Sequence, residues 1–140
     1  MTHPLLQVLD LHVHFDTPTG TVRANNGLTL EVREGESLGI MGESGCGKTV
    51  LIKHFIVLQR PTSGEVHFKG RRVDNLSERE LYSVRTHFGY LFQEGALFDS
   101  ITVAENIMFP IRQHFKEVKW REAEELVKAK LAMVGLDGFQ

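Results

Sequence analysis

The chain of 140 residues is about the size of one ordinary domain, and 41% of its residues are hydrophobic, which is enough to bury a core. The formal net charge is −2 and the 16 basic residues are spread along the sequence, so we expect no nucleic-acid partner. No apolar run approaches about 18 residues and no basic-then-apolar leader opens the sequence, so we expect neither a membrane span nor a signal peptide. Cys46 is the single cysteine, which excludes an internal disulfide. Together these features predict a cytoplasmic protein.

Two segments near the N-terminus have the alternation of strands. Residues 5–15 and 27–32 alternate apolar and polar side chains, as strands with one buried face do. Turn-forming residues follow each of them, at 16–20 and at 33–36. The sequence before residue 37 is therefore predicted to form a strand-rich layer.

The segment Gly42–Thr49 fits the phosphate-binding pattern G-x-x-x-x-G-K-[ST] at every fixed position. Residues 37–41 before it are mostly apolar and predict a buried strand. Residues 50–57 after it have the amphipathic spacing of a helix. The same pattern could arise as a glycine-rich turn that happens to precede a Lys-Thr pair, but a strand before and a helix after favour a phosphate-binding loop.

The residue types in this loop suit a nucleotide polyphosphate. Gly42, Gly45 and Gly47 lack a Cβ atom, so the loop can adopt positive φ and turn its N–H groups inward around a phosphate at the start of a helix. Lys48 is expected to contact the β- and γ-phosphates, and the Thr49 hydroxyl to bind Mg²⁺. The residues expected to bind Mg-ATP here are Gly42, Glu43, Ser44, Gly45, Cys46, Gly47, Lys48, Thr49 and Val50.

Beyond this loop, turns separate short elements. Residues 61–64 break the chain, residues 65–69 predict a short strand, and Gly70 begins another turn. Ser77 and Glu80 have capping-box spacing and predict a helix that ends at about residue 85. Residues 88–92 predict a further strand.

After residue 93 the pattern becomes helical. Thr102 and Glu105 form a second capping-box pattern, which predicts a helix from Val103 toward Met108 that ends before Pro110. Residues 116–134 carry the longest helical pattern, ended by Gly135, with a stripe at Ala123, Leu126, Val127, Lys130, Leu131 and Val134. Glu124 and Lys128 are expected to pair along this helix.

Several of these features resemble the ATP-binding subunit of ABC transporters. They are residues 34–36, the turn at 61–64 with its strand and Gly70, and Tyr90-Leu91-Phe92-Gln93, which matches the Q-loop of that family. The resemblance implies that Gln93 contacts Mg²⁺ and the attacking water, in a catalytic role, and lies at the hinge to a helical subdomain. It also places Phe15 where an aromatic ring stacks on adenine, although an ordinary core phenylalanine would give the same pattern.

The resemblance implies an α/β fold, a P-loop NTPase of ABC type with an antiparallel β layer. Residues 1–92 would form the β layer and P-loop core, and residues 93–140 the Q-loop and the start of a helical subdomain. The family's signature motif, its strand ending in Asp-Glu and its switch histidine do not occur in the chain, so we expect an N-terminal portion whose C-terminal half is absent. The complete protein would be a homodimeric ATPase, and this piece alone would be inactive.

The resemblance extends to two branches of transporters. Residues 92–100 and 102–106, with Phe109-Pro110, resemble the ATPases of lipid-asymmetry (Mla-type) phospholipid transporters. Residues 17–24 and 42–45 are similar to oligopeptide importers. We weight the first more, because the segment after the Q-loop faces the membrane-spanning subunits, which would hold the protein at the inner face of the membrane. A P-loop kinase or a non-catalytic nucleotide-binding module are the alternatives from other classes.

Overall fold

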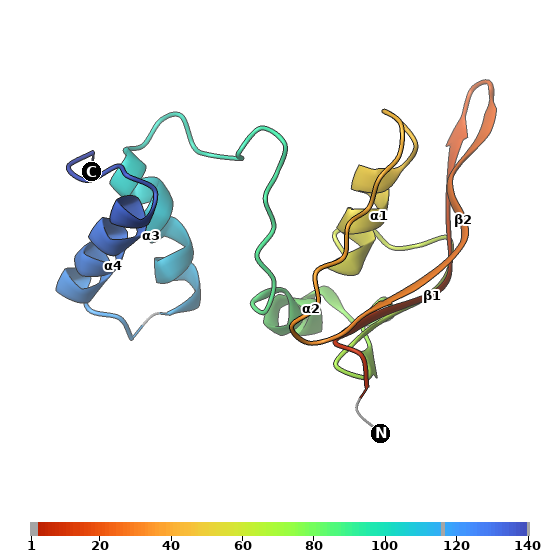
Figure 1. Cartoon of the computed structure of the whole chain (residues 1–140), viewed down its shortest axis with the longest axis horizontal. Coiled ribbons are helices and arrows are strands. Elements are labelled where there is room, and N and C mark those ends of the chain that lie inside the picture. Colours follow the sequence, from red (N-terminus) through yellow and green to blue (C-terminus); the bar gives the residue numbers. More distant parts are fainter. Residues whose placement is uncertain (1–2, 116, 140) are drawn as a thin grey trace. The chain divides into compact units, whose positions relative to one another are not determined.

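The computed structural model describes residues 3–115 and 117–139. The chain divides into two compact units, one ending at Phe88 and one beginning at Gly89. The first contains a four-stranded sheet with two helices, and the second contains two helices (Figure 1). In the part of the chain that is described, no helix has both the length and the apolar character needed to cross a bilayer.

The sheet of the first unit is antiparallel, with the strand order β2-β1-β3-β4. Its strands are β1 (Leu6–Thr17), β2 (Gly20–Val32), β3 (Ser63–Phe68) and β4 (Arg71–Arg72). The strands expected from the alternation at 5–15, 27–32 and 65–69 are confirmed. The first turn is shorter than expected, because Thr17 pairs directly with Gly20 and β2 therefore begins at Gly20.

A bulge in β1 explains why its buried residues do not keep one parity. Leu6 and Val8 are buried, and so are Leu11 and Val13, which are an odd number of positions further along. Asp10 lies between them with φ of 48°, and the register with β2 shifts between Val8 and Leu11. One extra residue in a strand returns the following side chains to the same face. Both apolar pairs consequently reach one core.

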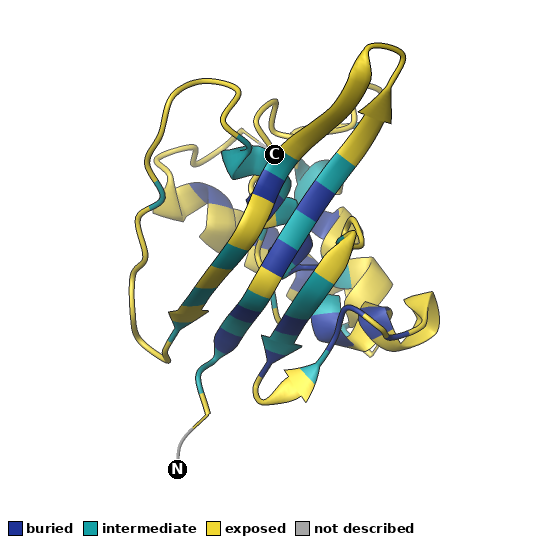
Figure 2. Ribbon diagram, turned by 90° about the vertical axis from the view of Figure 1, so that its right-hand side faces the viewer, coloured by how far each residue is buried: buried dark blue, intermediate teal, exposed yellow. Residues whose placement is uncertain are grey.

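Two helices of the first unit contribute to that core. They are α1 (Lys48–Phe55), in yellow in Figure 1, and α2 (Glu78–Arg85), in green. The strands of the sheet carry alternating bands of buried and more exposed residues (Figure 2). The shared core consists of Leu6, Val8, Leu11, Val13, Leu51, Val57, Val66, Phe68, Val73, Leu76, Leu81 and Val84. The capping box predicted for α2 is confirmed, since Ser77 accepts from the Glu80 N–H and Glu80 accepts from the Ser77 N–H.

The second unit is a pair of packed helices, α3 (Val103–His114) and α4 (Trp120–Met133). Their core is Met108, Ala123, Val127 and Leu131. The Thr102 and Glu105 capping box is confirmed, but the expected end before Pro110 is wrong. Proline removes one helical hydrogen bond. The helix nevertheless continues through Pro110, because Ile107 and Ile111 on either side both pack against the core shared with α4.

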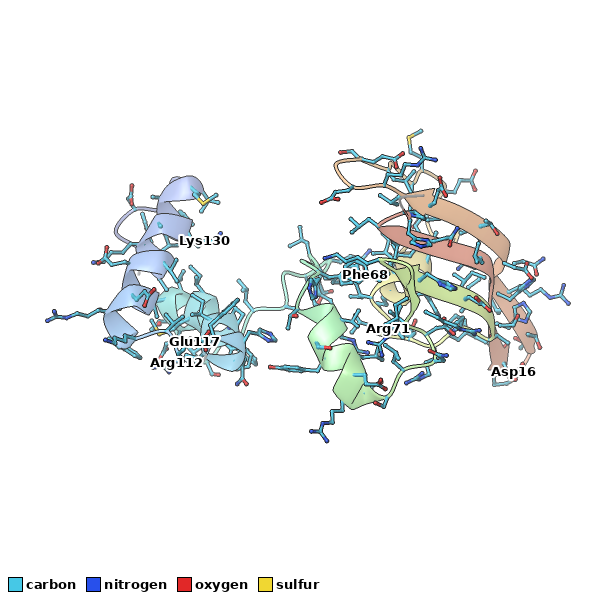
Figure 3. The ribbon with its side chains drawn as sticks, turned by 90° about the horizontal axis from the view of Figure 1, so that it is seen from below. Asp16, Phe68, Arg71, Arg112, Glu117 and Lys130 are labelled. Atoms are coloured by element: carbon cyan, nitrogen blue, oxygen red, sulfur yellow. The ribbon has the colours of Figure 1, made fainter. Side chains whose placement is uncertain are left out.

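Helix α4 differs from the expectation in its start and in one ion pair. It begins at Trp120, and Lys116 lies outside the described residues. It ends as expected at Gly135, where the N–H groups of Gly135 and Leu136 donate to Ala132 and Leu131 in a Schellman motif. Lys130, labelled in Figure 3, is exposed, as are Leu126 and Val134, so the buried stripe is narrower than expected.

The expected pair between Glu124 and Lys128 is wrong. Lys128 pairs with Glu125 at 3.0 Å, and Glu124 accepts a 2.7 Å hydrogen bond from the Trp120 indole N–H. The indole reaches one turn along the helix and takes the carboxylate that the spacing alone would give to lysine.

Two expected strands, at 37–41 and 88–92, do not form. A strand needs a partner for its backbone N–H and C=O groups, and among the described residues neither segment pairs with another. Both segments contain exposed apolar side chains, with Met41 at 95% and Leu91 at 89% exposure. The prediction of strands from the apolar pattern of these two segments is therefore wrong.

Candidate functional site

The phosphate-loop candidate leads directly into α1. Gly47 is the N-cap residue of that helix, and its φ of +91° lies in the left-handed region, as does the +80° of Gly45. L-residues rarely adopt these angles, so glycine at both positions lets the chain turn sharply into the helix. The expectation of positive φ is correct for Gly45 and Gly47 and wrong for Gly42.

Both Gly42 and Gly47 nevertheless lie where an added Cβ atom would be crowded, by a side chain at Gly42 and by backbone at Gly47. A Cβ atom at Gly42 would lie 2.7 Å from Cys46 Sγ, inside the loop itself. A Cβ atom at Gly47 would lie 2.4 Å from the carbonyl oxygen of Ala24, on β2. The loop therefore folds tightly on itself at one end and packs directly against the sheet at the other.

The first turn of α1 carries no acidic side chain beside its backbone N–H groups. The first intrahelical bond found there runs from the Leu51 N–H to the Gly47 carbonyl at 2.9 Å, so the amides of Lys48, Thr49 and Val50 precede the helical ladder. The first turn has no acidic residue and Gly47 offers no side-chain cap. The positive end of the helix dipole is thus not neutralised from within the helix.

Lys48 lies folded back over the loop. Its ammonium donates to the carbonyl oxygens of Gly42 and Glu43 at 2.8 and 2.7 Å, and lies 3.6 Å from Cys46 Sγ. Residues 42–46 are exposed and residues 47–50 are half-buried. A cation, a helix N-terminus and an exposed glycine-rich loop therefore meet at one place, which is the chemistry needed to bind a phosphate group.

The remaining predicted residues lie elsewhere. Phe15 is on β1, paired with Val22 across the hairpin, and its ring is partly exposed. Gln93 belongs to the second unit, in an exposed turn at residues 93–96. The structure thus brings together the loop residues 42–50, while Phe15 is in the same unit on the hairpin and Gln93 is in the other unit.

Two residues that support the loop were not predicted. Ala24 and Asn25 of β2 lie beside Gly47, with the Ala24 carbonyl oxygen 2.4 Å and the Asn25 amide nitrogen 3.3 Å from the position that a Cβ atom would take there. Asn25 is buried. The sequence 21–26 is largely polar, so the apolar alternation that indicated β2 began only after it. No signal in this segment marked these two positions.

Comparison with known proteins identifies relatives over most of the chain. The chain is 43% identical over 119 residues to the "Probable ribonucleotide transport ATP-binding protein mkl" of Mycobacterium bovis, and the alignment covers 85% of this chain and 33% of that protein. It is 44% identical over 111 residues to the "Intermembrane phospholipid transport system ATP-binding protein MlaF" of Haemophilus influenzae, covering 79% and 42%. It is 35% identical over 143 aligned positions to the "Oligopeptide transport ATP-binding protein OppF" of Escherichia coli, covering 94% and 43%.

A solved structure of an ATP-binding cassette is similar to nearly the whole chain. The ATP-binding cassette MJ0796, in a dimeric post-hydrolysis state bound to ADP and Pi, superposes with a TM-score of 0.89 at 25% identity, covering 95% of this chain and 58% of that one. The chain spans between a third and 43% of the length of the curated relatives described above. The sequence profile of the family described as "ABC transporter" matches residues 25–140. The chain therefore belongs to the ABC transporter family and covers the N-terminal part of its P-loop ATP-binding domain.

Proposed function

We propose that the full-length protein is the ATP-binding, energy-coupling subunit of an ABC transporter and hydrolyses ATP. The observation that supports this most is the loop at residues 42–48, where left-handed Gly45 and Gly47 lead into α1 and the Lys48 ammonium lies over the loop. Such a loop suits a polyphosphate, because N–H groups and one cation converge at a helix whose first turn has no acidic residue.

Each predicted site residue has a role in this proposal. The backbone of residues 42–50 binds the phosphates, and Lys48 exchanges the Gly42 and Glu43 carbonyls for the β- and γ-phosphate oxygens. Thr49 and Gln93 would hold Mg²⁺, which neutralises charge that develops on the phosphates. Gln93 would also position the attacking water. Phe15 would stack on adenine, for which its partial exposure at the hairpin is suitable.

We propose the same division of the chain as the sequence indicated. Residues 1–92 would form the β layer and P-loop core, and residues 93–140 the Q-loop with the start of the helical subdomain. The full-length protein would act as a homodimer bound to membrane-spanning subunits at the inner face of the cell membrane. The 140-residue piece alone would not hydrolyse ATP, because the signature motif and the glutamate that positions water lie outside it.

Calorimetric titration of the full-length protein with Mg-ATP tests the site. Lys48→Ala removes a charge-assisted contact worth about 1.5–3 kcal/mol, so binding should weaken by about tenfold or more. Lys53→Ala, which removes the same charge from the same helix outside the loop, is the matched control and should bind normally. Equal affinity in all three proteins would contradict the proposed site. Tight binding without any hydrolysis would instead favour a non-catalytic nucleotide-binding module.

We further propose that the transported molecule is a lipid. The 44% sequence identity to MlaF over 111 residues supports this proposal. The exposed apolar segment after Gln93, where Leu97 is 75% and Phe98 50% exposed, supports it as well. Asn106 holds this segment in place: it accepts from the Phe98 N–H at 2.8 Å and donates to the Phe98 carbonyl at 3.0 Å. The Phe98 ring packs against Phe109 at 5.0 Å. A stabilised, apolar surface of this kind suits a short helix of a membrane subunit.

An oligopeptide importer is the second candidate, supported by the similarity to OppF over 94% of the chain. Co-purification of the full-length protein with lipid-transporter and with peptide-importer membrane subunits distinguishes the two. The double substitution Leu97→Ser and Phe98→Ser should weaken association, while Val22→Ser, which changes an exposed apolar residue on the hairpin, should not. Association with the peptide-importer subunit alone would overturn the lipid assignment.

A further inference from the structure

The C-terminal end of α1 has a backbone conformation that its sequence does not favour. Val57 has φ of +50° although it is β-branched and only 2% exposed. It occupies the position usually taken by glycine in a Schellman motif: its N–H donates to the His54 carbonyl at 3.1 Å, and the Leu58 N–H donates to the Lys53 carbonyl at 2.9 Å. A strained residue of this kind persists only where its surroundings hold it.

Arg85 is one of the groups that hold it. This residue is the last of α2, and its guanidinium donates from Nε to the Ile56 carbonyl at 3.1 Å and from Nη2 to the Val57 carbonyl. The last carbonyls of a helix have no partner within the helix. Arg85 thus satisfies the carbonyl of the C-cap residue Ile56 from another helix, and also binds the carbonyl of the strained Val57 itself. Its Nη1 also pairs with Glu78 at 2.9 Å, which fixes the direction of the guanidinium.

Arg60 makes the reciprocal contact. It follows α1 in the chain, and its guanidinium donates to the carbonyls of Asp74 and Leu76, which precede α2, at 2.5 and 2.6 Å. Glu78 lies between the two arginines, with its second oxygen 3.7 Å from Arg60. We call Arg60, Glu78 and Arg85 the arginine clamp. Each arginine holds the backbone next to the other helix, so α1 and α2 are fixed to one another at these ends.

We propose that the arginine clamp, through Arg85, couples the phosphate loop to the segment 86–92 that leads into Gln93. The inference rests on the proposed nucleotide site. Helix α1 begins at Lys48 and spans eight residues, about 12 Å, so a change at its N-terminus reaches Val57 through one short rigid element. Arg85 transfers it to the end of α2, immediately before residue 86. Arg85 is thus a positioning residue for the Gln93 segment.

Arginine is needed for this role because one side chain reaches two carbonyls and a carboxylate at once. A planar guanidinium with five N–H donors can make all three contacts together, whereas a lysine ammonium at the same place can reach only part of the set. Arg71 is the matched comparison, an arginine of the same unit that also pairs with a glutamate of α2. Its guanidinium pairs with Glu80 of α2 at 3.0 Å, and among the described residues no hydrogen bond or ion pair joins it to α1.

Hydrogen exchange in the full-length protein, with and without the non-hydrolysable analogue Mg-AMP-PNP, tests the coupling. In the wild type the analogue should slow exchange at residues 86–92 by about fivefold or more. Arg85→Ala should abolish that slowing while the analogue still binds, and Arg85→Lys should restore part of it. Arg71→Ala should behave as the wild type. Slowing that persists in Arg85→Ala, or that is lost equally in Arg71→Ala, would overturn the proposal.

The same experiment distinguishes a failure of the coupling from a failure of the proposed function. A wild-type protein that does not bind the analogue would contradict the proposed function, whereas normal binding with no change at residues 86–92 would contradict the coupling alone. A second measurement checks the clamp directly. Arg85→Ala should accelerate exchange of the amides at 57 and 58 several-fold more in the wild-type background than in the Val57→Gly background, because glycine carries no left-handed strain. Equal acceleration in both backgrounds would overturn it.

Discussion

Gly47 and Gly35 share a backbone conformation but differ in what surrounds them. Their φ values are +91° and +76°, so any other residue at either position is strained by about 1–2 kcal/mol. Only at Gly47 would a Cβ atom also collide with a carbonyl oxygen, at 2.4 Å from that of Ala24, while at Gly35 nothing lies within 4 Å. The pair therefore distinguishes conformational strain from crowding at the loop.

Gly47→Ala should consequently lower stability by more than Gly35→Ala, and only Gly47→Ala should also weaken Mg-ATP binding, since the start of α1 must move away from β2. Urea denaturation and calorimetric titration of the full-length protein measure the two effects. If both variants lose the same stability and keep the same affinity, the contact between Gly47 and β2 does not shape the loop.

Cys46 offers a chemical probe of the same loop. Its thiol is exposed, and its sulfur lies 3.6 Å from the Lys48 ammonium that we assign to the phosphates. Bound Mg-ATP should cover it, so alkylation of Cys46 should slow by about tenfold or more at saturating nucleotide. Mass spectrometry of the Cys46 peptide follows the reaction, with Mg²⁺ alone as the control. An unchanged alkylation rate would place the nucleotide away from this loop.

Asp74 joins β3 to the chain after β4. Its Oδ1 accepts from the Val66 N–H at 2.8 Å, and both of its oxygens accept from Arg72. Burial acts to raise the pKa of Asp74, but the hydrogen bonds from Arg72 and Val66 and the charge of Arg72 outweigh it and hold the pKa below its ordinary value of 3.8. The ionised form is therefore favoured in the folded protein.

Because the pKa of Asp74 is lowered on folding, ionised Asp74 stabilises the folded state. This stabilisation is complete above about pH 4 and is lost as the pH falls through the lowered pKa of the folded protein. In Asp74→Asn the free energy of unfolding should therefore fall less steeply with pH below about pH 4. Asp74→Ala should lower the free energy of unfolding by about 1–3 kcal/mol at neutral pH, because the Val66 N–H loses its partner. Urea denaturation from acid to neutral pH measures both, with exposed Asp16→Asn as the control. If the free energy of unfolding of Asp74→Asn falls with pH as steeply as that of the wild type, ionised Asp74 does not stabilise the fold.

Elements that depend on local chemistry were predictable from the sequence. The two capping boxes form because Ser77 with Glu80, and Thr102 with Glu105, need only residues three positions apart. The positive φ angles of Gly45 and Gly47 are equally local. The exception is the end of α3, where packing of Ile111 against α4 outweighs the cost of Pro110 within a helix.

Elements that depend on distant partners were not predictable. The apolar run at 37–41 looks like a buried strand, but a strand forms only beside another strand, and the sequence of a segment does not contain its neighbour. The support of Gly47 by Ala24 and Asn25 is another case, since two polar-flanked residues on β2 gain their role only from the fold. Val57 in a left-handed conformation is a third, because no β-branched residue predicts that angle.

The exposed apolar segments make the isolated 140-residue piece prone to aggregation. Met41 and Leu91 are almost fully exposed, and their segments pair with no strand among the described residues. Unpaired apolar segments associate between molecules. We expect the isolated chain to aggregate at micromolar concentration and to melt without a sharp transition, as measured by light scattering and circular dichroism.

The double substitution Met41→Ser and Leu91→Ser should reduce this aggregation, whereas Tyr82→Ser, on the exposed side of α2, should not. A monodisperse monomer with a sharp cooperative melt would show that these segments are covered in solution.

The Lys48 side chain braces the phosphate loop as well as placing a charge there. Its ammonium joins the carbonyls of Gly42 and Glu43, so the side chain closes residues 42–48 into a ring braced from within. Alanine at this position would remove the brace as well as the charge, and the loop backbone would gain freedom that nucleotide binding must then take away. The entropy of binding in Lys48→Ala should therefore become less favourable along with the enthalpy, a signature that loss of a charge contact alone would not produce.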